Sequence, residues 1–428
     1  MSGDQRSVLT RLMFGWDPSN GVFANGSFRN LWAAASISLL GSQVTLLALP
    51  LTAILILHAT PFEMGILVFA ASIPPLLGSL PIGVWVDRAR RRRLMIAADL
   101  GRFLLLGSIP VAAILQVLTF PQLVVVAMVA SMLNLIFDIS ATSFLPSVLP
   151  RTELVAGNSR LEIARSTAQI GGPPLGGFLI QAISPPLAIA VDAISFLMSA
   201  GFLARVATPE EPGLTTQRRL TAEIRDGLKA VVQSPILRGF ALNTALFNTA
   251  WSAFITLYAL YATRSLHLSP GLLGLTLAGV GPGFLIGAML VGHLNRRFGI
   301  GPTILVACVC DCAGALLIPA AAGPTAVIVV MLFAGNLVLG LMNIVIAVNA
   351  ISVRQAITPD HLRGRVNATM RLVAWSIAPF GALVAGLLAQ SWGPRTVLLA
   401  GASLMLVAAV PLILSPIVRL RETPVLAA

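Results

Sequence analysis

The sequence consists of long apolar runs separated by short polar breaks, and this succession limits the fold more than any other feature. An α-helix needs about 20 consecutive apolar residues to cross the hydrocarbon core of a bilayer. Hydrophobic residues make up 57% of the 428 positions and charged residues 10%. Twelve crossings would use nearly all of this apolar content and leave no room for a large water-soluble domain. We predict an all-α integral membrane protein with twelve transmembrane helices, in the segments Asn30–Leu57, Phe62–Val86, Leu94–Val117, Pro121–Leu145, Asn158–Ala182, Pro185–Val206, Ile236–Ala262, Pro270–Leu294, Pro302–Ala322, Thr325–Ala350, Asn367–Ser391 and Arg395–Val418.

The positive charges are confined to alternate breaks. Of the 28 Lys and Arg residues, only Arg264 and Arg395 fall in breaks on one side of the predicted membrane. This is the pattern in which cytoplasmic loops carry the excess of Lys and Arg. It predicts a multi-pass membrane protein with both termini in the cytoplasm. The ratio of one Lys to 27 Arg points to a GC-rich bacterial genome, so we expect the bacterial plasma (inner) membrane. The net charge of +12 follows from this pattern, so we expect no nucleic-acid partner.

The longest polar break divides the chain into two halves of six helices each. Within it, the sequence from Thr221 predicts a short amphipathic helix. The predicted organisation is a cytoplasmic tail (1–29), a first six-helix bundle (30–207), a cytoplasmic linker (208–235), a second six-helix bundle (236–418) and a second tail (419–428).

The two halves resemble each other in sequence. Four pairs of residues are separated by the same 209 positions: Pro150 and Pro359, Asn158 and Asn367, Gly172 and Gly381, and Gly177 and Gly386. Two parallel repeats with a substrate site between them are a known plan of secondary transporters. We therefore expect the two bundles to be pseudo-symmetric.

The break between the second and third predicted helices reads Gly-Val-Trp-Val-Asp-Arg-Ala-Arg-Arg-Arg over residues 83–92. It resembles the loop signature of the major facilitator superfamily, although Arg90 stands where that signature has glycine. The resemblance implies the major facilitator fold and a conformational gate, in which an ion pair forms in one state and breaks in the other. The gate residues would be Gly83, Asp87, Arg88, Arg91 and Arg92. The alternative is a positively charged anchor without a gating role.

The fifth predicted helix contains Gly172, Pro173, Gly176 and Gly177, which resemble a feature associated with exporters of this superfamily. These residues would also suit close helix packing alone. With further stretches at 137–138, 145–150, 192–196 and 362–366, the chain resembles the branch that contains macrolide-efflux proteins and the enterobactin exporter. The resemblance extends from about residue 30 to about residue 419. The fourth helix lacks the arginine that many drug–proton antiporters carry there.

Ionisable residues inside the predicted helices are costly in a membrane and are candidates for function. Five carboxylates are candidates for carrying a coupling proton: Asp138, Glu162, Asp99, Asp192 and Asp311. Asp138 and Glu162 are preferred, because the resemblance places their helices at the central cavity. Asp192 and Asp311 would lie in peripheral helices, where a role as packed hydrogen-bond partners is the alternative. The charges in the third to fifth helices would otherwise form a static structural network.

The resemblance also implies that helices 1, 4, 7 and 10 line the central cavity. Their polar and aromatic residues are the candidates for substrate contact: Ser36, Gln43, Asn134, Asn243, Phe247, Trp251, Phe254, Tyr258, Asn336 and Asn343. Apolar walls with few polar groups suit a large amphiphilic molecule. The same residues would also serve to join helices to one another.

These features predict a monomeric, lipid-embedded secondary transporter that exports amphiphilic small molecules, such as drugs or siderophore-like metabolites, in exchange for protons. A lipid or lysolipid flippase of the same fold is the first alternative. A membrane sensor or enzyme is the second, against which stand the absence of a nucleotide-binding loop and of a His-rich cluster. We expect no cofactor and no metal, and we interpret Cys308, Cys310 and Cys312 as small apolar residues of one helix.

Overall fold

The computed structural model describes residues 21–208 and 220–422, and within these ranges the regular structure is helical. All twelve predicted segments are helices. They are α2 (Gly26–Leu55), α3 (Pro61–Arg88), α4 (Arg91–Ile114), α5 (Phe120–Val148), α6 (Leu154–Ile183), α7 (Pro185–Ala204), α9 (Pro235–Leu260), α10 (Pro270–Leu277) with α11 (Val280–Phe298), α12 (Ile300–Ala320), α13 (Thr325–Ile357), α14 (Asp360–Trp392), and α15 (Pro394–Val407) with α16 (Val410–Ile413). Ten of these segments are long and apolar enough to cross a membrane. The other two, α6 and α9, have the length but a more polar sequence.

Shorter elements complete the chain: η1 (Gly21–Ala24), η2 (Arg151–Glu153), the π-helical η3 (Tyr261–Ser265) and η4 (Pro416–Arg419). The short helix expected in the linker is α8 (Leu220–Gln233). It packs on the second half, where Val231 is buried with Val366 and Met370. Parts of the predicted tails and linker, at 1–20, 209–219 and 423–428, lie outside the described residues.

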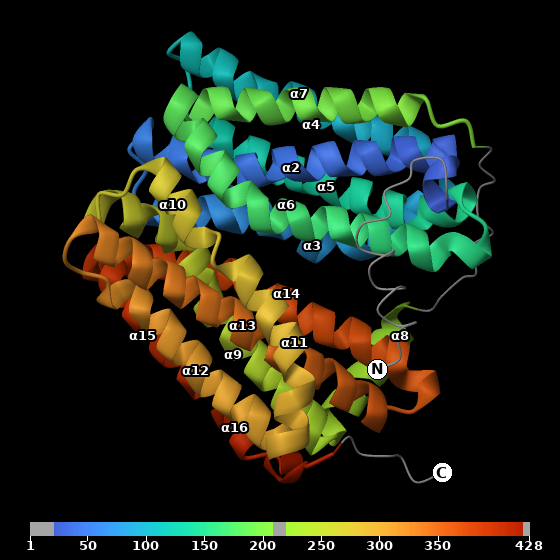
Figure 1. Ribbon diagram of the computed structural model, residues 1–428, viewed down its shortest axis with the longest axis vertical. Coiled ribbons are helices and arrows are strands. Elements are labelled where there is room, and N and C mark those ends of the chain that lie inside the picture. Colours follow the sequence, from blue (N-terminus) through green and yellow to red (C-terminus); the bar gives the residue numbers. More distant parts are fainter. Residues whose placement is uncertain (1–20, 209–219, 423–428) are drawn as a thin grey trace, which may run out of the picture.

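Helices α2–α7 form one bundle and α9–α16 form the other (Figure 1). Helix boundaries in the two bundles follow the 209-residue offset of the sequence. Three pairs of boundaries show this: α4 and α12 begin at Arg91 and Ile300, α7 and α15 begin at Pro185 and Pro394, and α5 and α13 end at Val148 and Ile357. Positions in the two bundles can therefore be matched residue by residue.

Two predicted helices are interrupted by short turns. Between α10 and α11 the chain turns at Ala278 and Gly279, and between α15 and α16 it turns at Ala408 and Ala409. Proline has no N–H to donate to the carbonyl four residues earlier. A proline follows shortly after each turn, Pro282 after the first and Pro411 after the second, which accounts for both breaks.

Several helices extend beyond the apolar runs from which they were predicted. Helix α13 continues to Ile357 rather than ending at Ala350, and α14 begins at Asp360 rather than Asn367. Hydropathy marks the part of a helix that suits the bilayer, whereas backbone hydrogen bonding continues into the polar region beyond it.

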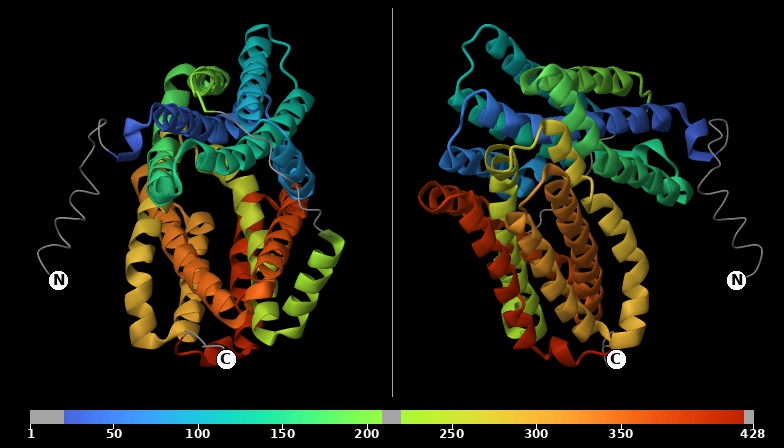
Figure 2. Two further views of the ribbon diagram at one scale, coloured as in Figure 1. Left: turned by 90° about the vertical axis from the view of Figure 1, so that its right-hand side faces the viewer. Right: turned by 60° about the vertical axis from the view of Figure 1, so that its left-hand side comes forward.

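The two bundles approach each other at the end that holds α10 and diverge toward the end that holds α8 (Figure 1; Figure 2 gives two further views). At the closed end, Arg264 donates a hydrogen bond to the Ile54 carbonyl at 3.2 Å. The backbone N–H of Gly271 donates to Gln181 Oε1 at 3.0 Å. The Arg-rich break at 88–93 lies at the opposite end, where α3 ends and α4 begins.

Glycines let the helices of the two bundles touch at the closed end. A Cβ on Gly177 of α6 would lie 2.5 Å from the Pro270 carbonyl oxygen and 2.9 Å from Gly274 Cα of α10. A Cβ on Gly65 of α3 would lie 2.7 Å from the Ala382 carbonyl oxygen of α14. Backbone-to-backbone packing of this kind is how small residues join helices in membranes.

Candidate functional site

The first bundle contains a buried ion pair on one turn of α4. Asp99 and Arg102 are joined by a salt bridge and are 0% and 3% exposed. Ser199 of α7 donates a hydrogen bond of 2.7 Å to the other carboxylate oxygen of Asp99. Arg102 donates to Asn134 Oδ1 of α5 at 2.5 Å. The pair therefore joins α4 to both neighbouring helices, and its charges are compensated inside the protein.

Two aromatic rings hold the Arg102 guanidinium. Its central carbon lies 4.6 Å from the centroid of Phe137 and 4.1 Å from that of Phe196. Both distances fall in the range of cation–π attraction. We call Asp99, Arg102, Asn134, Phe137 and Phe196 the Arg102 cluster.

Asp192 of α7 is a second buried carboxylate, 1% exposed. Ser195 donates a hydrogen bond of 3.0 Å to its Oδ1. The Thr45 hydroxyl of α2 lies beside the carboxylate, but Oδ2 makes no hydrogen bond of good geometry with the described residues. The carboxylate lies directly against Gly41 of α2, where any side chain would collide with it. Within the described part of the first bundle, two carboxylates and one guanidinium, that of Arg102, are thus buried.

The two preferred proton-carrier candidates are more exposed than Asp99 and Asp192. Asp138 of α5 and Glu162 of α6 are both exposed. Glu162 is 71% exposed and lies 3.9 Å from Arg165 Nε. A pair this exposed gains little from its attraction. The charges of α4–α6 therefore divide into a buried set and an exposed set.

The gate motif lies at the diverging end of the bundles. Asp87 and Arg88 end α3, are exposed and form no ion pair within the described parts of the chain. A Cβ on Gly83 would have no atom within 4 Å, so the close helix approach expected there is not made in this conformation. Arg91, at the start of α4, is half-buried.

Arg92 differs from the other motif arginines. It donates to the carbonyl oxygens of Leu203, at 2.8 Å, and of Ala204. These are the last carbonyls of α7, which lack partners within the helix. Arg92 therefore ties the start of α4 to the end of α7.

The glycines of the α6 motif face two different neighbours. Gly172 and Gly176 pack on α2, where a Cβ on Gly176 would lie 3.2 Å from Val44 Cα. Gly177 packs on α10 of the other bundle. The motif, with the kink-prone Pro173 inside it, thus sets both the packing of α6 within its bundle and the contact between bundles.

The predicted cavity residues of the first bundle lie in mixed surroundings. Ser36 and Gln43 of α2 are half-buried. The Gln43 side chain lies against Gly172, and Ser36 Oγ has no hydrogen-bond partner among the described residues. Asn134 is exposed and also binds Arg102.

In the second bundle, some of the predicted cavity residues join helices. Tyr258 Oη donates to Thr276 Oγ1 at 2.9 Å, and Asn336 Nδ2 donates to Tyr258 Oη at 2.8 Å. All three are buried and connect α9, α10 and α13. Asn243 donates to the Ala408 carbonyl at 2.6 Å. The rings of Phe247, Trp251 and Phe254 follow one another along α9, with 6.3 Å between successive centroids.

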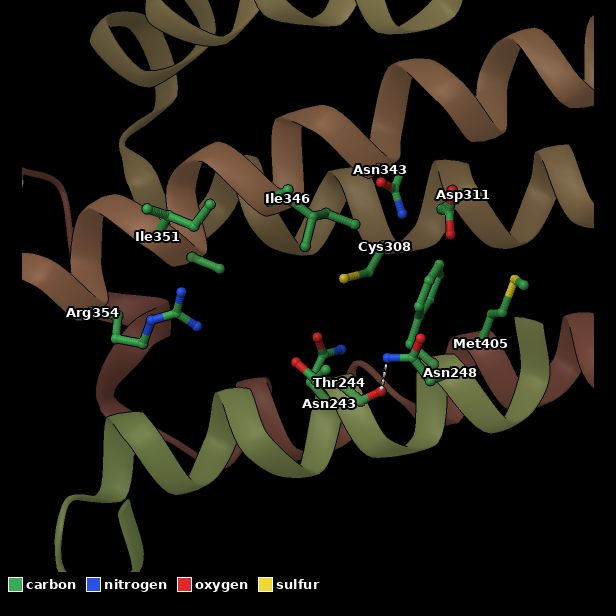
Figure 3. A pocket seen from close by; sticks show the side chains of 13 residues that line it. Asn243, Thr244, Asn248, Cys308, Asp311, Asn343, Ile346, Ile351, Arg354 and Met405 are labelled. Carbon is green, nitrogen blue, oxygen red and sulfur yellow. Dashed lines mark hydrogen bonds between the residues drawn. The ribbon is translucent and has the colours of Figure 1, made fainter. Parts of the chain in front are cut away.

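A cavity of about 320 Å³ opens inside the second bundle between α9, α12, α13 and α15 (Figure 3). Its walls include Phe247, Ile346 and Met405. Asp311 and Asn343 point into it at one end, and Arg354 lies at the other (Figure 3). Asp311 is 1% exposed, and its Oδ1 has no hydrogen-bond partner among the described residues. We call this cavity the α9–α13 pocket.

The family model of the Major Facilitator Superfamily matches residues 31–381. The chain belongs to the Major Facilitator Superfamily. It is therefore a multi-pass membrane transporter rather than an enzyme, as the sequence predicted.

The chain is similar to members of this superfamily that are named efflux proteins. It is 28% identical to the multidrug efflux pump Tap of Mycolicibacterium fortuitum over 397 residues, which cover 89% of this chain and 93% of that protein. It is 22% identical to macrolide efflux protein A of Streptococcus pyogenes over 274 residues, or 62% of this chain and 66% of that protein. The predicted resemblance to the macrolide-efflux branch is confirmed.

Solved structures of the superfamily share the fold. A mutant form of the nucleoside transporter NupG has a TM-score of 0.74 at 12% identity, covering 90% of this chain and 99% of its own. A bacterial homologue of ferroportin in its inward-facing state has a TM-score of 0.72 at 18% identity, covering 90% and 98%. The outward-facing state of a bacterial ferroportin homologue has a TM-score of 0.56 at 19% identity, with the same coverage.

Four residues of the pocket were candidates in the sequence. Asn243, Phe247 and Asn343 were predicted to line the substrate cavity, and Asp311 was predicted separately as a proton carrier. The sequence analysis did not name Arg354, Ile346 or Met405, which line the same pocket. Their apolar or helix-terminal positions are unremarkable in a membrane helix. The 209-residue offset would have found Ile346 and Met405, because it matches them to Phe137 and Phe196 of the Arg102 cluster. It would not have found Arg354, which it matches to Leu145.

Proposed function

We propose that this transporter exports amphiphilic small molecules across the bacterial plasma membrane by alternating access, in exchange for protons. The Arg-rich ends of the bundles and both termini would lie in the cytoplasm, in accord with the positive-inside pattern. The efflux activity named for the multidrug pump Tap and for macrolide efflux protein A supports export.

The observation that carries the transport mechanism is the difference between the two ends of the molecule. The end without the Arg-rich breaks is joined by Gly65, Gly177 and the hydrogen bonds of Arg264 and Gln181. At the other end the gate residues Asp87 and Arg88 have no ion-pair partner among the described residues. An inward-facing state of an alternating-access cycle has this arrangement. The greater likeness to the inward-facing ferroportin homologue supports it.

The gate would form when the inner ends of the bundles come together. Asp87 and Arg88 would then bind partners on the second bundle, and Gly83 would allow the helices to approach. Arg92 would stay bound to the end of α7 in both states, because the carbonyls that it contacts lie in its own bundle. An ion pair that exists in one state only shifts the balance between the two states.

Among the five carboxylate candidates, Asp192 suits proton exchange best. It is buried beside α2, a helix that lines the central cavity in this superfamily, and one of its oxygens makes no hydrogen bond of good geometry with the described residues. Asp99 is paired with Arg102, Asp138 and Glu162 are exposed, and Asp311 lies in the α9–α13 pocket inside the second bundle. A carboxylate that is buried in one state and reaches water in the other can carry a proton across the cycle.

The export proposal is tested by ethidium accumulation in cells that express the wild-type protein or carry an empty vector. Expression should lower accumulation, and a proton uncoupler should abolish the difference. Equal accumulation in both cell types, repeated with a neutral amphiphile, would contradict export of amphiphiles. Proteoliposomes with an imposed pH gradient test coupling separately, since transport that ignores the gradient would refute proton exchange alone.

A further inference from the structure

The α9–α13 pocket stands at the position that the Arg102 cluster occupies in the first bundle. The 209-residue offset matches the five residues of the cluster to five residues that all line the pocket: Asp99 to Cys308, Arg102 to Asp311, Asn134 to Asn343, Phe137 to Ile346, and Phe196 to Met405. The boundaries of the helices that carry them follow the same offset. The pocket and the cluster are therefore the same place in the two repeats.

The substitutions between the repeats explain why one place is filled and the other is hollow. In the first bundle a guanidinium and two aromatic rings occupy the space. In the second bundle Asp311, Ile346 and Met405 are smaller or lack rings, and a cavity of about 320 Å³ remains. This is the lower end of the volume range of small-molecule sites.

The charge at the equivalent position is also opposite in sign in the two bundles. Where the first bundle has the Arg102 cation, the second has the Asp311 carboxylate, whose Oδ1 has no partner among the described residues. The polar or charged groups that share the pocket with Asp311 are Asn243, Thr244, Asn248, Cys308, Asn343 and Arg354, of which only Arg354 is cationic, and it lies at the opposite end (Figure 3). A buried carboxylate without a counter-charge is costly and takes up a proton to relieve that cost, so an organic cation from outside the chain would bind in place of that proton.

We propose that the α9–α13 pocket is a binding site for the guanidinium or ammonium group of an organic cation, with Asp311 as its counter-charge. The first bundle already holds a guanidinium at this position. There the Arg102 guanidinium is bound by a carboxylate, an asparagine oxygen and two aromatic rings. In the second bundle Asp311 and Asn343 supply the oxygens, and Phe247, Ile346 and Met405 supply the apolar walls. The pocket's role as part of the substrate site rests on the export function proposed above. The binding of an organic cation to the pocket does not depend on that function.

Arg354 adds a second requirement on the ligand. Its Nε has no hydrogen-bond partner among the described residues, and it lies at the end of the pocket away from Asp311. A second cation at that end of the ligand would be repelled. The site therefore selects monocations with an apolar body over long dications.

The test uses the full-length protein in lipid nanodiscs and phenylguanidinium as the probe, with neutral phenylurea as its isostere. Calorimetric titration should show saturable binding of phenylguanidinium to the wild type and none of phenylurea. Asp311→Asn should raise Kd by about tenfold or more, because losing one partner of a buried charge pair weakens binding strongly. Asp360→Asn removes an equal charge from the exposed start of α14 and should leave Kd unchanged.

A second variant keeps the carboxylate and removes the space. Ala347→Leu adds an aliphatic side chain to the pocket lining, without a ring that would attract a guanidinium, and it should also weaken phenylguanidinium binding. Because a bound ligand stabilises the folded state, the probe should raise the thermal unfolding temperature of the wild type but not of either pocket variant.

The absence of saturable binding to the wild type would overturn the proposal, and so would equal Kd values for wild type and Asp311→Asn. If the wild type exports ethidium but does not bind phenylguanidinium, the cation site is refuted and the export function stands. If the wild type binds phenylguanidinium but does not export ethidium, the cation site stands and the export function is refuted.

Discussion

Gly177 of α6 and Gly274 of α10 touch across the two bundles, so that a Cβ on Gly177 would lie 2.9 Å from Gly274 Cα. By the repeat offset of 209, Gly274 corresponds to Gly65 and Gly177 corresponds to Gly386. Gly65 and Gly386 form the matching contact between α3 and α14, where a Cβ on Gly386 would lie 3.1 Å from Gly65 Cα. Two pseudo-symmetric glycine contacts thus hold one end of the transporter closed.

Gly177→Ala should hinder this closure, because its Cβ would lie 2.5 Å from the Pro270 carbonyl oxygen. We expect a roughly tenfold lower rate of substrate export, since one closed state of the cycle is destabilised by about 1–3 kcal/mol from overpacking. Gly107→Ala in α4 is the matched control, because a Cβ there meets nothing within 4 Å. Spin-label distances between the end of α6 and the start of α10 would show the shift, and unchanged distances in Gly177→Ala would contradict it.

Arg102→Met should destabilise the first bundle by about 3–5 kcal/mol, because it leaves Asp99 buried without its counter-charge. The double variant Asp99→Asn with Arg102→Met removes both charges and should recover part of the loss. Thermal unfolding of the purified variants measures both effects. A double variant less stable than Arg102→Met alone would show that the pair is not the source of the loss.

Asp192→Asn should keep the fold and lose the response of transport to a pH gradient, because the amide has the same shape but cannot exchange a proton. Glu162→Gln should keep that response, since Glu162 is 71% exposed in this state. Transport in proteoliposomes with and without an imposed pH gradient separates the two variants. A normal response in Asp192→Asn would exclude this carboxylate as the proton carrier.

Tyr258→Phe and Trp251→Ala should have different effects, although both residues belong to the predicted cavity stripe on α9. Tyr258 is buried and bonded to Thr276 and Asn336, so its loss should lower stability by about 0.5–1.5 kcal/mol without altering substrate affinity. Trp251 is half-buried, and its truncation should weaken substrate binding. Unfolding and binding measurements on both variants decide which residues contact substrate and which join helices.

Arg88→Ala and Arg92→Ala should also differ, although the two residues are neighbours in the gate motif. Arg92 is bonded to the end of α7, so Arg92→Ala should mainly lower the unfolding temperature. Arg88 has no ion-pair partner among the described residues in this state, so Arg88→Ala should leave stability unchanged and alter the balance between inward-facing and outward-facing states. Cysteine accessibility at the two ends of the protein measures that balance, and an unchanged balance in Arg88→Ala would argue for the anchor alternative.

Much of the fold was predictable because the bilayer imposes a length and a polarity on each helix. All twelve segments were located from apolar runs, and the repeat was found from residues such as Asn158 and Asn367. Helix ends such as Ile357 and Asp360 were missed, because they lie where the polarity signal stops but the helix continues. The turns that Pro282 and Pro411 introduce were also missed, since proline in a membrane helix does not always break it.

The sequence by itself determined the helical membrane fold, the division into two repeats and the membership in a transporter superfamily. These follow from hydropathy, charge placement and motifs, which are local properties of the chain. Only the tertiary structure decided which charges are compensated. It buried Asp99 against Arg102, left Glu162 exposed, and placed Asp311 without a partner among the described residues in the pocket equivalent to the Arg102 cluster. Such differences depend on which side chains from distant helices meet in space, and no local pattern records that.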